Sequence, residues 1–225
     1  MQFKDDFLPY ERAEEKLEKF FGLVTEYNKK VNLTSITERD EFFVKHIWDS
    51  LAGQKYFGFG ADAAEVGSGG GFPSIPLKIC RPDIKFTLIE SVNKKCIFLE
   101  KAAEELGLEN VKVLNLRAED AGKGSLREKF DVCCARAVAR LNTLLEYCAP
   151  LVKTGGSFVA YKGIADDEVK EAVHAAAVLG MKLETFERYE LPGDMGARSI
   201  VVYKKVKPTP AKYPRGQGRE RRCPL

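Results

Sequence analysis

A glycine-rich stretch from Glu65 to Pro73 carries the residues best suited to binding a ligand through the backbone. It follows the short apolar run Ala63-Ala64 and precedes a segment from Ile75 that is typical of a helix start. A strand that turns through glycines into a helix exposes backbone N–H groups, and the helix dipole favours a carboxylate or phosphate there. We therefore expect a ligand at the glycines, which include Gly67, Gly69 and Gly71.

The spacing of these glycines separates two classes of nucleotide cofactor. The dinucleotide fingerprint Gly-x-Gly-x-x-Gly needs a small last residue, but counting from Gly67 places Phe72 there, and counting from Gly69 places Ser74. An acid two places before the first glycine, here Glu65, is similar to the S-adenosylmethionine loop of Rossmann-type methyltransferases. The spacing favours S-adenosylmethionine over NAD, and a glycine-rich loop without a ligand is the alternative.

Acidic residues follow the next two predicted strands. Ligands bind beyond the carboxyl ends of the strands in an open parallel sheet. Glu90 ends the predicted strand 86–90 and is placed to accept hydrogen bonds from two ribose hydroxyls, the alternative being a surface acid. After the strand 111–116, Glu119 or Asp120 could receive an adenine amino group or cap the next helix.

Three further polar residues leave their roles open. Arg136 lies between two alanines at the tip of an apolar strand, where a guanidinium is costly without an anionic partner. A bound carboxylate, an RNA phosphate or a protein acid would each supply one. His46 and Asp49 are three residues apart on one predicted helix face, and they form either a local polar pair or a catalytic dyad.

The order of elements that must position these residues predicts an α/β fold. Apolar steps of three and four predict a helix over 11–31, and a second helix follows Thr37, whose hydroxyl would cap it. From about residue 61, apolar strands alternate with helices, which predicts a parallel sheet covered on both faces. Two strand-like segments, 182–191 and 199–206, are joined without room for a helix and predict an antiparallel closing hairpin. The elements between are predicted at 96–106, 130–135, 141–151, 157–162 and 167–179.

Composition indicates one large domain with extensions. The 225 residues are 44% hydrophobic and 31% charged, which suits a soluble globular protein. No signal-peptide pattern is present and no apolar run approaches the ~18 residues of a membrane span, so we expect a cytoplasmic protein. Six cysteines without a Cys-x-x-Cys pair, and two histidines, indicate reduced thiols and no metal site. We expect an N-terminal helical cap over 1–58, a sheet domain over 59–206 and a basic tail over 207–225.

The charge is concentrated in that tail. The chain carries +3 in total, but residues 207–225 hold six basic residues against one acid, or +5, which leaves −2 elsewhere. A basic tail on a near-neutral body indicates a polyanionic partner, and the alternative is a solvated tail that aids solubility. The six basic residues are Lys207, Lys212, Arg215, Arg219, Arg221 and Arg222.

Several segments together resemble one family, the bacterial 16S rRNA guanine-N7 methyltransferases known as RsmG or GidB. The most specific are Asn-Leu-Thr at 32–34, His-x-x-Asp-Ser-Leu at 46–51 and Tyr-Pro-Arg at 213–215. The likeness covers essentially the whole chain. Two departures stand out: the family often has Asp in place of Glu65, and it commonly continues Lys-Ala-Gly-Thr-Pro where this chain reads Gly-Gln-Gly-Arg-Glu. The further matching stretches are 27–28, 65–76, 88–91, 94–95, 118–119 and 135–137.

The resemblance implies a seven-stranded class I methyltransferase fold and methyl transfer from S-adenosylmethionine to guanine 527, in the 530 loop of 16S rRNA. S-adenosylhomocysteine would be the product and the small ribosomal subunit the partner, with no obligate protein partner and no membrane. The resemblance places Gly67, Phe72, Ala118, Glu119 and Arg136 at the cofactor. The matched segments that would face RNA contain His46, Asp49, Lys212, Tyr213 and Arg215.

The implied chemistry needs no general base, because the N7 atom of guanine has a free lone pair and no proton. In-line positioning of N7, methyl carbon and sulfur can supply ~7–11 kcal/mol of the barrier, and no catalytic residue is assigned. The major groove of A-form RNA is too narrow to reach N7, so the base must be unpaired. The competing hypotheses are an RNA-binding module that does not use the cofactor, an NAD-dependent oxidoreductase, and a small-molecule methyltransferase of the same fold.

Overall fold

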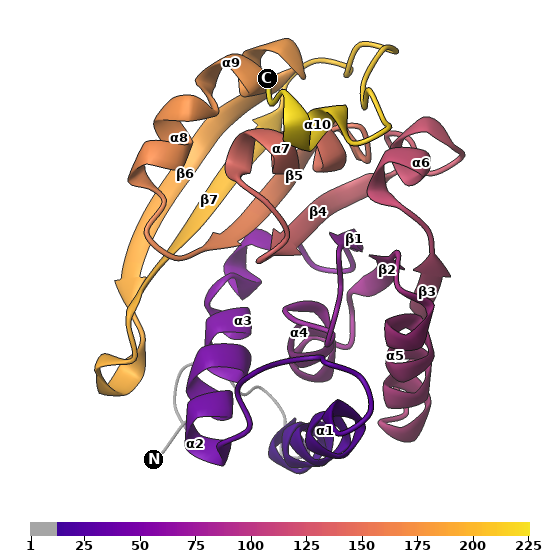
Figure 1. The fold of residues 1–225 in the computed structure, drawn as a ribbon, viewed down its shortest axis with the longest axis vertical. Helices are drawn as coiled ribbons and strands as arrows, with labels where there is room; N and C mark the ends of the chain where they lie inside the picture. Colours follow the sequence, from indigo (N-terminus) through magenta and orange to yellow (C-terminus); the bar gives the residue numbers. More distant parts are fainter. Residues whose placement is uncertain (1–12) are drawn as a thin grey trace.

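Seven strands form one sheet in the order β3-β2-β1-β4-β5-β7-β6 in the computed structural model, which describes residues 13–225 (Figure 1). Strands β1 to β5 pair in parallel, and β7 runs antiparallel between β5 and β6. The predicted parallel sheet with an antiparallel closing hairpin is confirmed. The strands are β1 Asp62–Val66, β2 Lys85–Glu90, β3 Val111–Asn115, β4 Phe130–Arg136, β5 Val152–Lys162, β6 Met181–Glu190 and β7 Ala197–Lys205.

The central strands are apolar on both sides because the sheet is covered on both faces. Successive side chains of a strand point to opposite faces. On β1, Ala63 joins one hydrophobic core and Ala64 the other, and on β4 the same holds for Cys134 and Cys133. These continuous apolar runs are typical of a parallel sheet buried between helices.

Two helical layers cover the sheet. The first contains α1 Ala13–Asn28, α4 Ser74–Cys80 and α5 Asn93–Glu105, together with the helical run that follows α1 (Figure 1). The second contains α6 Ala118–Lys123, α7 Leu141–Cys148, α8 Asp166–Glu171, α9 Val173–Val178 and α10 Arg219–Arg222. Two short 3-10 turns complete the described elements, η2 Gln54–Tyr56 and η3 Pro192–Asp194. The N-terminal helices and the C-terminal tail therefore pack on opposite faces of the sheet.

The second predicted helix is continuous but changes its winding in the middle. It consists of α2 Arg39–Phe42, a π-helical turn η1 Phe43–Trp48 and α3 Asp49–Ala52. The expected cap at Thr37 is wrong, since Glu38 precedes the first helical residue and a capping side chain must occupy that position. A π turn inside a helix frequently marks a functional site, and this one carries His46 with Asp49 directly after it.

The first helix ends earlier than predicted because a side chain competes with the backbone. Asn28 Oδ1 accepts hydrogen bonds from the N–H groups of Leu33 and Thr34, at 2.7 and 3.1 Å. An Asn side chain that bonds nearby backbone groups favours a turn over further helix. Of the predicted helix 11–31, residues 11 and 12 lie outside the described residues, as does the segment 1–12 of the predicted cap.

The hydrophobic cores extend across both predicted domain boundaries. Leu17 and Phe20 of α1 share one core with Ile75 of α4, and Tyr213 of the tail belongs to the other core. The tail is thus a packed part of the fold rather than a solvated extension. The division into cap, sheet domain and tail stays a prediction about the roles of these segments.

Candidate active site

The glycine loop connects β1 to α4 through a backbone that requires glycine. Gly67, Gly69 and Gly71 have φ values of 70°, 53° and 86°, which residues with a Cβ rarely adopt. A Cβ on Gly67 would lie 2.5 Å from Val138 Cγ2, and a Cβ on Gly71 would lie 2.6 Å from Ile75 Cγ1. The loop is therefore held tightly between α4 and the segment that follows β4.

Glu90 lies beside this loop at the end of β2 and its side chain is buried. Its Oε2 accepts the N–H of Gly69 at 2.9 Å, and its Oε1 accepts the N–H of Val92 at 2.8 Å. A carboxylate can accept about four hydrogen bonds, so both oxygens retain capacity for a ligand. Glu90 both fixes the loop and remains able to bind hydroxyl groups.

A cleft of about 390 Å³, here called the first cleft, opens beside the loop at the carboxyl ends of β1, β2 and β3. Among the predicted site residues, Gly67, Ala118 and Glu119 line it, and Glu90 lies between the lining residues Ile89 and Ser91 without lining it itself. The residues considered for the cofactor that do not line it are Gly69, Gly71, Phe72, Glu90, Asp120 and Arg136. The other lining residues are Val66, Ile89, Ser91, Leu116, Arg117, Val138, Tyr147, Gly218 and Arg221. Three of these, Tyr147, Gly218 and Arg221, come from α7 and the tail, and no sequence pattern indicated them.

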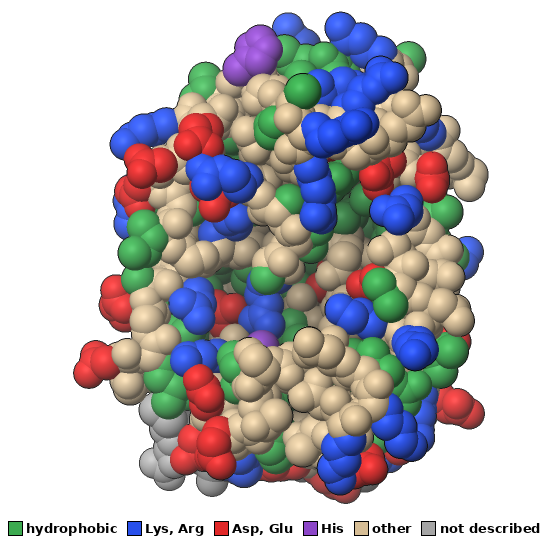
Figure 2. Space-filling model, in the orientation of Figure 1, with side chains coloured by type: hydrophobic (Ala, Val, Ile, Leu, Met, Phe, Trp, Pro, Cys, Tyr) green, Lys and Arg blue, Asp and Glu red, His purple; other side chains and the backbone are tan. Residues whose placement is uncertain are grey.

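A second cleft of about 340 Å³ lies beyond β4 and β5. Ala137 lines it while the next residue, Val138, lines the first cleft, so this short segment separates the two. Ala137 has a φ of 56°, an unusual value for alanine that is found more often near ligand sites. The face drawn in Figure 2 is hollowed near its middle, where basic, acidic and histidine side chains meet. The lining includes Lys45, His46, Asp49, Arg136, Lys162, Glu168 and Arg198.

Arg136 has a protein acid as its partner, which was one of the three alternatives left open. Its guanidinium donates to Asp49 Oδ2 at 2.8 Å and to the carbonyl of Lys45 at 3.0 Å. It also lies over the ring of Phe72, 5.1 Å from the centroid. Asp49 is almost fully buried and additionally accepts the hydroxyl of Tyr189 at 2.7 Å. The helical run, the glycine loop and β4 thus meet at one guanidinium.

His46 is held neutral between two partners. Its Nδ1 lies 2.6 Å from the Arg136 guanidinium, which can only donate, so Nδ1 accepts and Nε2–H donates to Thr34 Oγ1 at 2.7 Å. Burial, reinforced by the charge of Arg136, lowers the pKa of His46 to about 3. The ring stacks on Phe72 at a centroid distance of 4.1 Å. His46 and Asp49 therefore share Arg136 instead of forming a His–Asp dyad.

The Glu65 carboxyl lies fully buried beneath the loop, near the same guanidinium. Burial raises the pKa of Glu65 to about 8, so the carboxyl is mostly protonated at neutral pH. This acid of the loop pattern is consequently a neutral group inside the fold. It lines neither cleft.

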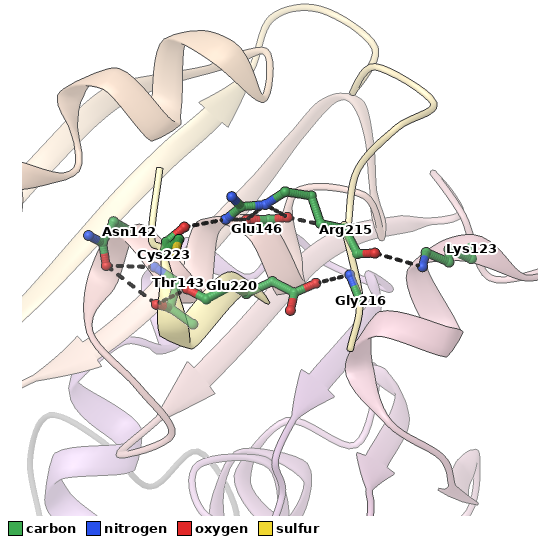
Figure 3. A network of polar contacts seen from close by, with 8 residues as sticks. All are labelled: Lys123, Asn142, Thr143, Glu146, Arg215, Gly216, Glu220 and Cys223. Atoms are coloured by element: carbon green, nitrogen blue, oxygen red, sulfur yellow. Dashed lines mark hydrogen bonds and ion pairs between the residues drawn. The ribbon is translucent and has the colours of Figure 1, made fainter. Parts of the chain in front are cut away.

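The predicted RNA-facing residues of the tail differ in their surroundings. Tyr213 is buried, and Arg215 forms an ion pair with the buried carboxylate of Glu146 at 2.7 Å (Figure 3). Lys212 is exposed, with its ammonium 5.2 Å from the ring centroid of Tyr213. The structure therefore brings Phe72, His46, Asp49 and Arg136 together, but it directs the Arg215 side chain into the fold.

Residues 13–225 contain no group of three His, Cys, Asp or Glu side chains placed to hold a metal ion. None of their helices is both long and apolar enough to cross a membrane.

Comparison with protein families identifies the chain. The family model GidB, described as rRNA small subunit methyltransferase G, matches residues 13–195. A Lactobacillus helveticus protein named ribosomal RNA small subunit methyltransferase G is 46% identical over 228 residues, covering 99% of this chain and 95% of that protein. A Brevibacillus brevis protein of the same name is 47% identical over 219 residues, covering 96% and 92%. The chain belongs to the GidB family.

Solved structures share the fold at low sequence identity. The M. jannaschii protein TYW2, determined in complex with AdoMet, aligns with a TM-score of 0.57 at 15% identity, covering 76% of this chain and 80% of that one. The P. horikoshii TYW2 in complex with MeSAdo gives a TM-score of 0.57 at 13% identity, covering 70% and 61%. These likenesses confirm the Rossmann-like class I methyltransferase fold predicted from the sequence.

Proposed function

We propose that this member of the GidB family transfers the methyl group of S-adenosylmethionine to the N7 atom of an unpaired guanine in small-subunit rRNA, guanine 527 of the 530 loop. The observation that carries the proposal is the pair of clefts on either side of Ala137-Val138. One cleft has the glycine loop and free acceptors for a nucleoside. The other is lined by several cations, which suits a polyanion.

The residues that line the first cleft, together with Glu90 beside it, fit S-adenosylmethionine. The spare acceptor capacity of Glu90 suits the two ribose hydroxyls, and Glu119 in the first turn of α6 suits the adenine amino group. The narrow glycine loop lets the backbone approach the ligand closely. When bound, the cofactor supplies an electrophilic methyl group on a sulfonium sulfur.

The chain's own contribution to the reaction is positioning. Guanine N7 needs no deprotonation, and this agrees with a neutral His46 whose two ring nitrogens are both engaged. Holding the base still against the methyl carbon removes much of the entropic barrier. Arg136, with Phe72 beneath it, fixes the boundary between the clefts where the two reacting groups would meet.

The second cleft also suits a guanine base. Lys162 and Arg198 offer donors for the O6 acceptor of guanine. Glu168, which is paired with Lys162 at 2.8 Å, offers a carboxylate for the N1–H and amino edge. An unpaired base would present both edges at once, as expected for a loop nucleotide.

The test is methyl transfer to small ribosomal subunits that lack the modification, with the modified nucleotide mapped. We expect 7-methylguanine at a single position in the 530 loop. Saturable binding of S-adenosylmethionine without transfer to rRNA would instead favour a small-molecule methyltransferase. RNA binding without any affinity for the cofactor would favour a non-catalytic binding module.

A further inference from the structure

The basic tail is clamped to the domain by a buried ion pair. Arg215 donates through its Nε and its backbone N–H to Glu146 Oε1, at 2.9 and 2.8 Å, and through a terminal nitrogen to Oε2 at 2.7 Å. Glu146 on α7 is fully buried. Figure 3 shows this pair at the centre of a network that joins α6, α7 and the tail. A bidentate pair of this kind fixes direction as well as position.

A second set of hydrogen bonds holds the short helix α10 that follows. The buried carboxylate of Glu220 accepts the N–H of Gly216, and the carbonyl of Glu220 accepts the hydroxyl of Thr143 at 2.9 Å (Figure 3). Arg127 donates to the carbonyl of Tyr213 at 2.8 Å. The segment Gly216–Arg222 is therefore placed by interactions on both of its sides.

These hydrogen bonds and the ion pair position the part of the tail that lines the first cleft. Gly218 and Arg221 line the cleft together with Tyr147. Arg221 donates to the carbonyl of Val138 at 3.3 Å, and Val138 is the residue that packs on Gly67. Arg221 thus connects the tail to the segment between the clefts.

Arg221 and Glu119 line the same cleft, as does Tyr147 of α7. Burial raises the pKa of the Tyr147 phenol, and the charges of Glu119 and Arg221 both act on it. Ser91, which follows β2, and Ala118, which begins α6, also line this cleft. A planar guanidinium in such a place can stack on a purine ring.

We infer that Gly218 and Arg221 of the tail are part of the cofactor site and that Arg221 contacts the adenosyl group of S-adenosylmethionine. This rests on the proposed function. The tail then has two cations with defined tasks, Arg215 as a clamp and Arg221 as a ligand contact. The tail's contribution to catalysis is separate from any contact it makes with RNA.

Neighbouring arginines of the tail offer a matched test. Arg222 donates to the carbonyl of Gln217 at 2.8 Å and lines neither cleft, so Arg222→Ala removes the same charge without touching the site. Binding of S-adenosylmethionine and of S-adenosylhomocysteine is measured by calorimetry on the full chain without RNA. We expect Arg221→Ala to weaken both ligands roughly tenfold and Arg222→Ala to leave both unchanged.

Both ligands carry the adenosyl group, so an effect on only one of them would contradict the contact. Equal affinities for the two variants, whether unchanged or equally weakened, would overturn the inference. Thermal unfolding of each variant shows that it is folded, and Arg221→Lys, which keeps the charge without the planar group, should still bind more weakly than the wild type. If the wild-type chain itself binds neither ligand, the proposed function fails instead.

Discussion

The two clefts are built in different ways although a single segment separates them. At the first, Glu119 lines the cleft, and the Glu90 carboxylate beside it accepts two backbone N–H groups. In the second, two carboxylates neutralise part of the charge of four cations, as in the Arg136–Asp49 and Lys162–Glu168 pairs. The first cleft therefore has unused hydrogen-bonding capacity for a ligand, whereas the second depends on ion pairs for its shape. Substitutions at the second cleft should therefore lower the free energy of unfolding, whereas substitutions at the first should lower ligand affinity.

The largest expected effect is on stability, at the second cleft. Arg136→Ala leaves the buried Asp49 carboxylate without its main partner and should lower the free energy of unfolding by about 3–5 kcal/mol, with loss of methyl transfer. Urea unfolding measures this. Arg188→Ala, which breaks an exposed pair with Asp166, is the control and should leave the free energy of unfolding nearly unchanged. Similar losses in the two variants would contradict the buried network.

The next effect is on ligand affinity, at the first cleft. Glu90→Ala removes acceptors for charge-assisted hydrogen bonds and should weaken S-adenosylmethionine binding by about 1.5–3 kcal/mol, or roughly ten- to a hundredfold. Calorimetry gives the dissociation constant directly. Asp120→Asn, which removes a nearby acid but leaves Glu90 and its hydrogen bonds in place, should bind normally. Unaltered affinity in the Glu90 variant would remove this residue from the cofactor site.

A smaller effect should appear in the pH dependence of stability. The folded state keeps His46 neutral down to a pKa of about 3, while the unfolded chain takes up a proton near pH 6.5. Stability from this group is therefore present above the unfolded pKa and is lost as the pH falls toward the folded one. Between pH 8 and pH 5 the loss should reach about 2 kcal/mol.

Glu65 acts in the opposite direction, so the His46 contribution must be isolated by difference. The pKa of Glu65 is raised in the folded state, so this group stabilises the fold at a pH below its unfolded pKa of 4.5. That stabilisation is lost as the pH rises toward 8. The stability of His46→Gln relative to the wild type should rise by about 2 kcal/mol between pH 8 and pH 5. A difference that does not change with pH would show that His46 titrates normally in the fold.

The smallest expected effect concerns RNA contact by the tail. Lys212 is exposed, and if it contacts a phosphate then Lys212→Ala should reduce the salt dependence of RNA binding by about 0.7 log units per log unit of salt. Filter binding over a range of salt concentrations measures the slope. Lys101→Ala on α5, on the other helical layer, is the control. An unchanged slope in the Lys212 variant would exclude the contact.

The sequence predicted part of the first cleft because local patterns position Gly67, Ala118 and Glu119, whereas Tyr147, Gly218 and Arg221 reach it from distant segments. Glycines at alternate positions define the turn after β1, and Glu90 and Glu119 follow directly from the ends of β2 and β3. The antiparallel hairpin was likewise predictable, since the link between 182–191 and 199–206 is too short for a crossover helix. The element ends were less exact, and β5 begins five residues before the predicted strand at 157.

The second cleft was less predictable because the residues that pair with one another there are far apart in the chain. Arg136 and Asp49 are separated by 87 positions, and no spacing rule connects them. Tyr189 and Arg198 reach Asp49 from the hairpin, which tertiary packing alone determines. The packing of the tail was not predictable for the same reason: its charge is visible in the sequence, whereas its pairing with the buried Glu146 through Arg215 is not.

The division of labour between the clefts is tested most directly by comparing two variants in one experiment. Arg198 lines the second cleft and lies 3.8 Å from the Asp49 carboxylate, whereas Arg136 lies 2.8 Å from it. Because Arg198 is the more distant partner, Arg198→Ala leaves the Arg136–Asp49 pair in place. Cofactor affinity and the single-turnover rate of methyl transfer at saturating cofactor are measured for Arg198→Ala and Glu90→Ala. We predict that Arg198→Ala binds S-adenosylmethionine normally but transfers the methyl group at least tenfold more slowly, on the order of one lost charged hydrogen bond, whereas Glu90→Ala shows the reverse pattern. Equal loss of cofactor affinity in both variants would contradict the two-cleft account.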